Sequence, residues 1–232
     1  MLSPAPALKT GRFRAAPFFA WLVGLSALTL SGCSSSGSPL LSTLGSVIPF
    51  QHGNLASRAR KIPYASINLS FGRGGGLLIL TKQKHGLTFW QTKRNETVVL
   101  QHGLLQSTAG TKPRLEMTQA LNAKGKPMTM ASLNGDEHFI VERSWVDNKG
   151  DRYAGRAQAH WQCSSTTRKI KLPLVTRQLH KCTETLNWAN HGTTRSVYWR
   201  DAGGHIWKAE VTAWPGAPGI SWQVARPWWP QS

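Results

Sequence analysis

Along most of the chain, apolar side chains return at every second position. In residues 64–71, for example, the odd-numbered residues are apolar, whereas Ser66, Asn68 and Ser70 are polar. Because successive side chains of a strand point to opposite faces, this pattern predicts β-strands with one buried face. The expected strands cover residues 65–71, 77–80, 87–90, 97–100, 137–146, 152–161, 168–175, 180–188, 195–200, 205–214 and 220–225.

Glycine-rich and polar segments separate these runs. Residues 72–76 contain four glycines and lead into a strand, so we expect a hairpin turn and not a phosphate-binding loop, which opens a helix. Asp147-Asn148-Lys149-Gly150 is a strong hairpin signal, and a further turn is expected near Leu179. Pro227 and Pro230 are expected to end regular structure. About ten to twelve strands at near-even spacing predict an all-β fold, either a sandwich or an antiparallel meander that forms an open or half β-barrel.

The first 32 residues have a different pattern. Three basic residues, Lys9, Arg12 and Arg14, precede an apolar stretch that begins at Phe18 and ends in Leu30-Ser31-Gly32-Cys33. This stretch is shorter than the roughly 20 residues that cross a bilayer comfortably. The order of basic, apolar and small residues followed by cysteine resembles the lipobox of bacterial lipoproteins. The resemblance implies export, cleavage before Cys33 and a diacylglycerol on the sulfur of Cys33.

This interpretation divides the chain into a signal peptide (1–32), a lipidated flexible tether (33–57) with a short helix near residues 40–44, and a single β domain (58–232). Two or three acyl chains on Cys33, palmitate among them, would anchor the protein stably to a membrane. Ser34 follows the cysteine where an Asp would retain a lipoprotein at the inner membrane. By analogy with lipoprotein sorting in Gram-negative envelopes, we expect an outer-membrane lipoprotein whose domain faces the periplasm.

The net charge of +18 falls only to +15 without residues 1–32, which hold three of the 28 basic and none of the 10 acidic residues. A charge of this size often indicates nucleic-acid binding. An exported lipoprotein meets little nucleic acid, so we expect no such partner. Phosphorylated lipid headgroups and acidic polysaccharide are the polyanions of its compartment.

Two cysteines remain besides Cys33, namely Cys163 and Cys182. An even pair in an oxidising compartment predicts a structural disulfide. A redox pair would more often be spaced Cys-x-x-Cys, and a metal site would need more ligands nearby.

No motif in the sequence indicates an enzyme. The eight histidines show no spacing typical of zinc, so neither a metal nor another cofactor is expected. Asp136-Glu137-His138 is the densest titratable group and could support acid–base chemistry, but a turn after Asn134-Gly135 explains it better. The sequence also lacks a Gly-x-Ser-x-Gly elbow, so we identify no catalytic residue.

Eleven tryptophans are the remaining compositional anomaly. Indole faces stack on sugar rings, and a neighbouring cation would suit an acidic glycan. Trp199-Arg200 and Trp207-Lys208 have this pairing, so these four residues are candidate glycan contacts. At least half of the tryptophans are nevertheless expected in the core. Trp228-Trp229, which lie between prolines, could instead contact a membrane interface.

Several segments resemble the YjbF/YmcC-like lipoproteins. The resemblance begins with Lys-Ile-Pro-Tyr-Ala-Ser-Ile at 61–67, continues through 77–80, 87–90 and 98–105, and returns at 197–201 and at Trp214-Pro215. These lipoproteins are encoded alongside exopolysaccharide or group 4 capsule export genes. The resemblance therefore implies an all-β open or half barrel with a role in polysaccharide secretion or assembly, and it carries over no catalytic residue. Gln101-His102-Gly103 and the Cys163/Cys182 pair depart from the family pattern.

The sequence thus favours a non-enzymatic outer-membrane lipoprotein that assists exopolysaccharide or capsule secretion by binding polysaccharide or export-machinery proteins. The alternative is a periplasmic lipid or lipoprotein carrier or acceptor with an open β-barrel, which an apolar concave face would favour. A polar groove with exposed Trp and Arg would favour a glycan. An enzyme would need a cleft in which His138 or another histidine meets a carboxylate.

Overall fold

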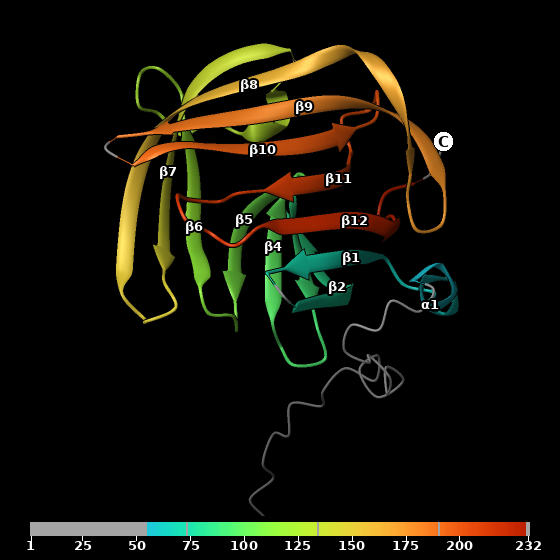
Figure 1. The fold of residues 1–232 in the computed structure, drawn as a ribbon. Coiled ribbons are helices and arrows are strands. Elements are labelled where there is room, and N and C mark those ends of the chain that lie inside the picture. Colours follow the sequence, from blue (N-terminus) through green and yellow to red (C-terminus); the bar gives the residue numbers. More distant parts are fainter. Residues whose placement is uncertain (1–54, 73, 134, 190, 231–232) are drawn as a thin grey trace, which may run out of the picture. The chain divides into compact units, whose positions relative to one another are not determined.

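The computed structural model describes residues 55–230, apart from residues 73, 134 and 190. Within this part of the chain, twelve antiparallel strands form one sheet in the order β5-β4-β3-β2-β1-β12-β11-β10-β9-β8-β7-β6. The sheet curves into a nearly closed barrel, with β8–β12, β1 and β2 on the near side of Figure 1 and β4–β7 behind them. The all-β antiparallel prediction is therefore confirmed.

The strands are β1 (Ser66–Phe71), β2 (Gly74–Lys84), β3 (Leu87–Gln91), β4 (Thr97–Gln101), β5 (Leu104–Ala109), β6 (Arg114–Leu121), β7 (Asp136–Val146), β8 (Arg152–Lys171), β9 (Thr176–Trp188), β10 (Gly192–Arg200), β11 (Ile206–Val211) and β12 (Ile220–Arg226). Two short helices accompany them, α1 (Leu55–Lys61) and the 3-10 helix η1 (Met130–Ser132). In the described residues, no helix has the length and apolar character needed to cross a membrane.

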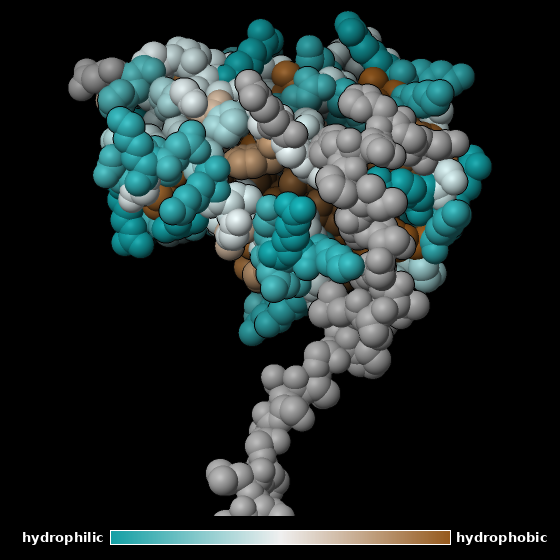
Figure 2. Space-filling view, turned by 60° about the horizontal axis from the view of Figure 1, so that its bottom comes forward, coloured by the Kyte–Doolittle hydropathy of each residue, from teal (hydrophilic) through white to brown (hydrophobic). Residues whose placement is uncertain are grey.

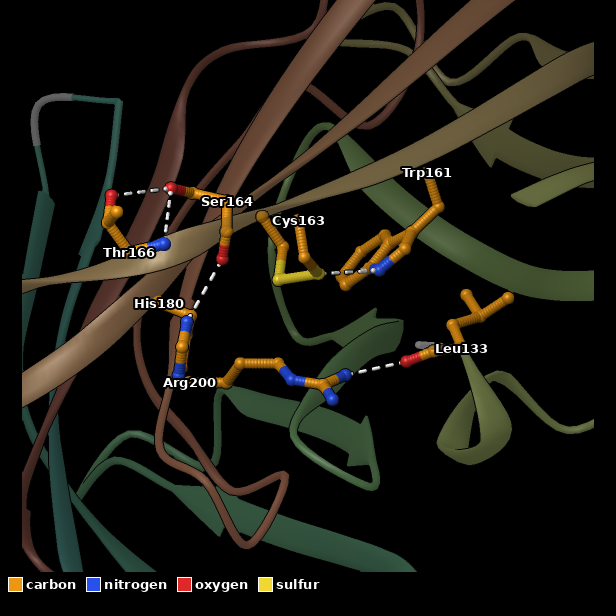
Figure 3. Close-up of a disulfide and its surroundings, with 8 residues drawn as sticks. Leu133, Trp161, Cys163, Ser164, Thr166, His180 and Arg200 are labelled. Carbon is orange, nitrogen blue, oxygen red and sulfur yellow. Dashed lines mark hydrogen bonds between the residues drawn. A yellow bond between two sulfur atoms is a disulfide. The ribbon is translucent and has the colours of Figure 1, made fainter. Parts of the chain in front are cut away.

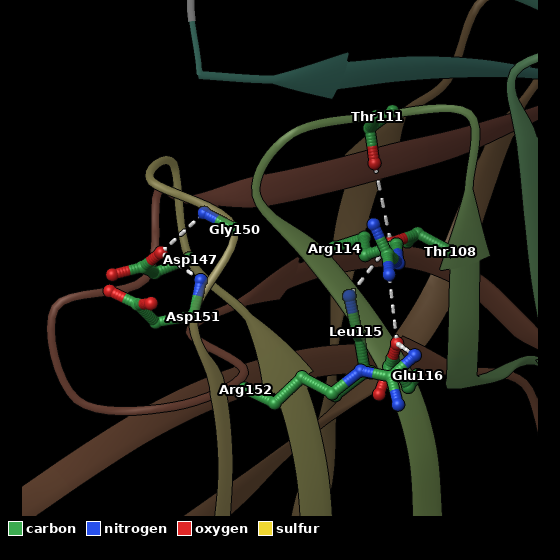
Figure 4. Close-up of polar contacts among 9 residues, drawn as sticks. All are labelled: Thr108, Thr111, Arg114, Leu115, Glu116, Asp147, Gly150, Asp151 and Arg152. Carbon is green, nitrogen blue, oxygen red and sulfur yellow. Dashed lines mark hydrogen bonds and ion pairs between the residues drawn. The ribbon is translucent and has the colours of Figure 1, made fainter.

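The barrel has one seam, between the two edge strands β5 and β6. No backbone ladder joins these strands, although they follow each other in the chain. Side chains bridge the gap instead: Thr108 Oγ1 accepts the backbone N–H of Leu115 at 2.9 Å, and the Gln106 amide donates to the carbonyl of Thr118. Figure 4 shows Thr108 and Leu115 together with Glu116, whose carboxylate lies 3.0 Å from Arg114 and 3.6 Å from Arg152.

Tryptophan side chains fill much of the barrel interior. Six of them are buried, as the sequence predicted for at least half: Trp90, Trp161, Trp188, Trp207, Trp214 and Trp222. Buried indole N–H groups find acceptors on neighbouring strand residues, such as Thr88 Oγ1 for Trp90 and Thr194 Oγ1 for Trp188, both at 2.9 Å. These indoles are therefore part of a packed core.

Several details of the strand prediction were wrong. Residues 168–175 do not form a separate strand, because β8 continues to Lys171 and the turn to β9 lies at Leu172–Val175, not near Leu179. The exposed polar residues between Cys163 and Thr167 form a bulge, and this interruption of the alternation hid the continuity of β8.

Gly74–Gly76 belong to β2 and pair with β1, so these three glycines extend the strand and are not part of the hairpin turn at Gly72. The sequence also did not predict strands β5 and β6 or helix α1. The signal peptide, Cys33 and the short helix expected near residues 40–44 lie outside the described residues.

Candidate functional site

One end of the barrel contains a pocket of about 400 Å³. In an antiparallel meander alternate turns lie at the same end, which brings together Gly86 of the β2–β3 turn, His102 of the β4–β5 turn and Gly203 to His205 of the β10–β11 turn. Residues from η1 and from the segment after β12 complete the wall. Together with Trp161 of β8, the pocket is thus assembled from six regions of the chain.

The C-terminal segment supplies an aromatic wall. Pro227 follows β12 and offers no backbone N–H to continue the ladder, so the chain leaves the sheet there. The Trp229 ring stacks on His205 with centroids 4.5 Å apart and planes 4° apart, and meets Trp207 edge-on at 5.1 Å. Trp228 contacts Trp90 at 5.0 Å. Both rings therefore pack against the core while they line the pocket.

Arg200 brings a positive charge to this wall. It is the last residue of β10, and its Nη1 donates to the carbonyl of Leu133 at 2.6 Å (Figure 3). His102 and His205 line the same pocket, and no Asp or Glu is among the described residues that line it. The pocket lining therefore combines indole faces with cationic or neutral donors.

Asp201 does not line the pocket but accepts hydrogen bonds from residues in or beneath its wall. Its carboxylate accepts the backbone N–H of His205 at 2.9 Å and the indole N–H of Trp207 at 2.8 Å, and it lies 3.3 Å from the His205 ring nitrogen Nδ1. The carboxylate thus orients two of the ring systems that Trp229 contacts.

The predicted disulfide is confirmed, and it lies beside Trp161 of the pocket wall. Cys163 on β8 and Cys182 on β9 are direct cross-strand partners, and their sulfurs are bonded. Trp161, which lines the pocket, donates its indole N–H to Cys163 Sγ at 3.1 Å, as Figure 3 shows. The disulfide therefore fixes the strand pair that carries Trp161.

The structure divides the four predicted glycan contacts into two groups. Arg200 lines the pocket, and Trp207 is buried beneath Trp229 with the Arg177 guanidinium 4.8 Å from its ring centroid. Trp199 and Lys208 lie on the other face of the wall, where Lys208 Nζ is 4.3 Å from the Trp199 ring and 2.8 Å from Glu210. Residues that are adjacent in a strand point to opposite faces, so sequence neighbours could not form one site.

The sequence pattern did not predict that His102, His205, Trp228 and Trp229 line a pocket. For His102 the sequence did indicate a turn, because Gly103 follows it. The structure has this turn, and the φ of His102 is 50°. Nothing in the local sequence shows, however, that the residues after Pro227 pack against the turns of other hairpins.

A second charged group lies in the sealed centre of the barrel. Arg143 and Glu184 are 2% and 0% exposed, with Arg143 Nη2 3.4 Å from each Glu184 carboxylate oxygen. Arg143 Nη1 donates to the carbonyl of Ala213 at 2.6 Å, and the Tyr198 hydroxyl donates to Glu184 at 3.4 Å.

Burial raises the pKa of Tyr198 well above its usual value, the charge of Glu184 adds to this effect, and Arg143 opposes it. The tyrosine therefore remains a neutral donor. Without access to solvent, this group stabilises the fold and does not offer a reaction site.

Comparison with known proteins supports the fold and identifies the family. The hypothetical lipoprotein YmcC from Escherichia coli (K12) has a similar crystal structure, with a TM-score of 0.64, 12% sequence identity, and coverage of 75% of this chain and 89% of that chain. At this identity the likeness shows the fold alone. No curated protein sequence matches the chain.

The family model for the group 4 capsule polysaccharide lipoproteins gfcB and YjbF matches residues 54–224, which include β1 to β11 and most of β12. The description of this family names a lipoprotein and no enzymatic activity. The chain therefore belongs to the YjbF family of group 4 capsule polysaccharide lipoproteins.

Proposed function

We propose that this protein is a non-enzymatic outer-membrane lipoprotein that assists capsule or exopolysaccharide secretion, and that it binds an acidic saccharide unit of the polymer in the end pocket. The observation that carries this proposal is the lining of the pocket. Aromatic rings, Arg200 and two histidines surround a space of about 400 Å³ without a carboxylate among the described lining residues.

Each feature of the pocket suits an acidic sugar. The face of a pyranose ring carries C–H groups that pack against an indole, while its hydroxyls need donors and acceptors at the edge of the ring. A guanidinium holds a carboxylate through charge-assisted hydrogen bonds, often two in parallel. The volume lies within the range typical of small-ligand sites, about 300–1,000 Å³. One or two sugar residues are therefore the expected occupant, held as part of a longer chain.

The lipobox-like N-terminus and the family support the proposed position of the protein. Lipid on Cys33 would hold the domain at the outer membrane, facing the periplasm, with the residues between Cys33 and helix α1 as a tether. Family membership suggests envelope export proteins as neighbours. In this position the pocket would meet polymer before or during its export.

A binding titration tests the proposal. The full-length protein in detergent micelles is titrated with acidic oligosaccharides prepared from the capsule or exopolysaccharide of its host, followed by tryptophan fluorescence at two salt concentrations. We expect saturable binding that weakens at the higher salt concentration, because a charge pair contributes. Arg200→Ala and Trp229→Ala should each weaken binding at least tenfold.

Lys208→Ala is the matched control, since it removes a cation beside a tryptophan on the outer face of the same barrel wall. Binding that is unchanged in Arg200→Ala, or reduced equally in Lys208→Ala, would contradict the pocket assignment. Absence of binding to every oligosaccharide would contradict the saccharide role itself.

One observation favours the carrier alternative. On the face shown in Figure 2, apolar side chains are visible in a hollow between polar ones. The pocket wall also includes Leu104, Met130 and Ile206, which would suit an acyl chain. Displacement of a fluorescent fatty acid by phospholipid, with no response to saccharide, would support a lipid or lipoprotein carrier. The packed tryptophan core leaves less room for acyl chains than an open barrel would, so we favour the saccharide.

A further inference from the structure

Two histidines and an aspartate meet on the outer face of the barrel wall, away from the residues that line the pocket. His138 on β7 and His160 on β8 are direct cross-strand partners, and Asp136 lies two residues before His138. Residues at this spacing share one face of a sheet. Phe139, which lies next to His138 in the strand, points to the other face and is buried in the core.

The three side chains already interact with one another. The rings of His138 and His160 are stacked, with centroids 4.4 Å and planes 4° apart. His160 Nε2 lies 2.6 Å from Asp136 Oδ1, and Gln162 Nε2 donates to Asp136 Oδ2 at 3.4 Å. One potential ligand atom from each of Asp136, His138 and His160 lies within 4.8 Å of the other two.

We propose that Asp136, His138 and His160 bind a divalent transition-metal cation, with Zn²⁺ as the best match. Two imidazole nitrogens and one carboxylate oxygen form a common zinc donor set, with metal–ligand distances of about 2.0–2.2 Å. Such bonds in a tetrahedron place the ligand atoms about 3.4 Å apart. The observed atoms reach that spacing through rotations of side chains at the barrel surface, and water would take the fourth position. Mg²⁺ and Ca²⁺ fit less well because they prefer oxygen ligands.

The surrounding wall holds the ligands in place. The backbone N–H of Cys163 donates to the Gly135 carbonyl at 2.8 Å, which extends the pairing of β7 and β8 beyond Asp136. Cys163 is in turn bonded to Cys182 on β9. Gln162 holds one oxygen of Asp136 and leaves the other directed at His160. Ligands on a rigid scaffold with a hydrogen-bonded carboxylate lose less entropy when a metal binds.

Sequence spacing predicted no metal site because the ligands come from the two arms of a hairpin. His138 and His160 are too far apart in the chain to resemble a zinc motif. Only the register of β7 and β8 makes them partners. The site is independent of the proposed saccharide pocket.

Metal titration of the full-length protein in detergent micelles tests this proposal. The protein is purified without a polyhistidine tag, stripped with a chelator and titrated with Zn²⁺ against a chromophoric competitor. We expect one equivalent to bind. His138→Ala and His160→Ala should each weaken binding at least tenfold, and Asp136→Asn should weaken it less. Co²⁺ should give the visible absorption of a four-coordinate site in the unsubstituted protein and lose it in both histidine variants.

His191→Ala is the control, because it removes an exposed histidine from the β9–β10 turn. Circular dichroism checks that all variants are folded. Binding of Zn²⁺ that survives in both histidine variants, or that falls equally in His191→Ala, would overturn the assignment. So would a folded, unsubstituted protein that fails to compete for one equivalent of Zn²⁺.

Discussion

The centre and the end of the barrel each combine an arginine with tryptophans, but they differ in access to solvent. In the centre, Arg143 is 2% exposed and is neutralised by Glu184, which is fully buried. At the end, Arg200 lines an open pocket whose described lining residues include no carboxylate. The same residue types therefore stabilise the fold in one place and present a binding surface in the other.

This difference shows what distinguishes a binding group from a core group. A buried charge needs a partner of opposite sign, because the desolvation penalty is otherwise too large. At the end of the barrel Arg200 is only half-buried, so its charge keeps contact with solvent. In the proposed complex, a carboxylate of the saccharide would interact with this charge.

The largest expected effect on stability comes from removing one member of the buried Arg143–Glu184 pair. Glu184→Leu leaves Arg143 buried without its carboxylate and should lower the free energy of unfolding by about 3–5 kcal/mol. The double variant Arg143→Met/Glu184→Leu should recover most of this loss, since two apolar side chains need no partner. Urea unfolding followed by circular dichroism measures both. A double variant less stable than the single one would refute the idea that loss of charge compensation causes the damage.

Removing the disulfide should cost less stability than leaving either member of the Arg143–Glu184 pair buried alone. In the chain-entropy model, the bond between Cys163 and Cys182, separated by 19 positions, contributes about 3 kcal/mol. The variant Cys163→Ser/Cys182→Ser should lose stability by about this amount and also bind saccharide more weakly, because Trp161 loses a partner in the pocket wall. Unfolding curves and the fluorescence titration check the two effects separately. Equal stability with and without the bond would contradict the structural role of the disulfide.

Replacing each arginine by methionine compares the two regions directly. Arg143→Met leaves Glu184 buried and uncompensated, and should cost about 3–5 kcal/mol. Arg200→Met loses the hydrogen bond to Leu133 and should cost about 1–2 kcal/mol. Saccharide affinity should show the opposite order, with the larger loss in Arg200→Met. If Arg143→Met, measured under conditions where it is folded, weakened binding as much as Arg200→Met, the distinction between the two regions would fail.

The smallest effect concerns a carboxylate outside both regions. Asp147 at the β7–β8 turn accepts backbone N–H groups, and Figure 4 shows it beside Gly150 and Asp151. Desolvation opposes ionisation here, but the hydrogen bonds from Asp151, Lys149 and Gly150 outweigh it and lower the pKa of Asp147 below its usual 3.8.

A lowered pKa means that the charged form stabilises the folded state above pH 3.8 and that this contribution disappears as the pH falls through the folded-state pKa. Asp147→Asn should therefore lower the Tm slightly at pH 7, and the difference should shrink at pH 3. Thermal melts at both pH values measure it. A difference that grows on acidification would contradict this account.

Local patterns predicted the strands well because alternation and turn residues act over a few positions. The 147–150 turn and the edges of β12 follow from such signals. The pocket could not be predicted in the same way, since strand order brings its walls together from distant hairpins. Trp199 and Arg200 illustrate the limit: they are neighbours in the chain, yet only Arg200 lines the pocket. The stacking of Trp229 on His205 likewise depends on how the segment after Pro227 packs, which no local pattern encodes.

The most direct test of the saccharide pocket is an NMR titration of the indole N–H signals. Full-length protein labelled with ¹⁵N-tryptophan in detergent micelles is titrated with the acidic oligosaccharide, after assignment by single Trp→Phe variants. The signals of Trp229, Trp228 and Trp207 should shift in a saturable manner, whereas those of Trp199 on the outer face and Trp188 and Trp222 in the core should stay in place. Shifts confined to Trp199, or shared equally by all tryptophans, would contradict a saccharide site at the end of the barrel.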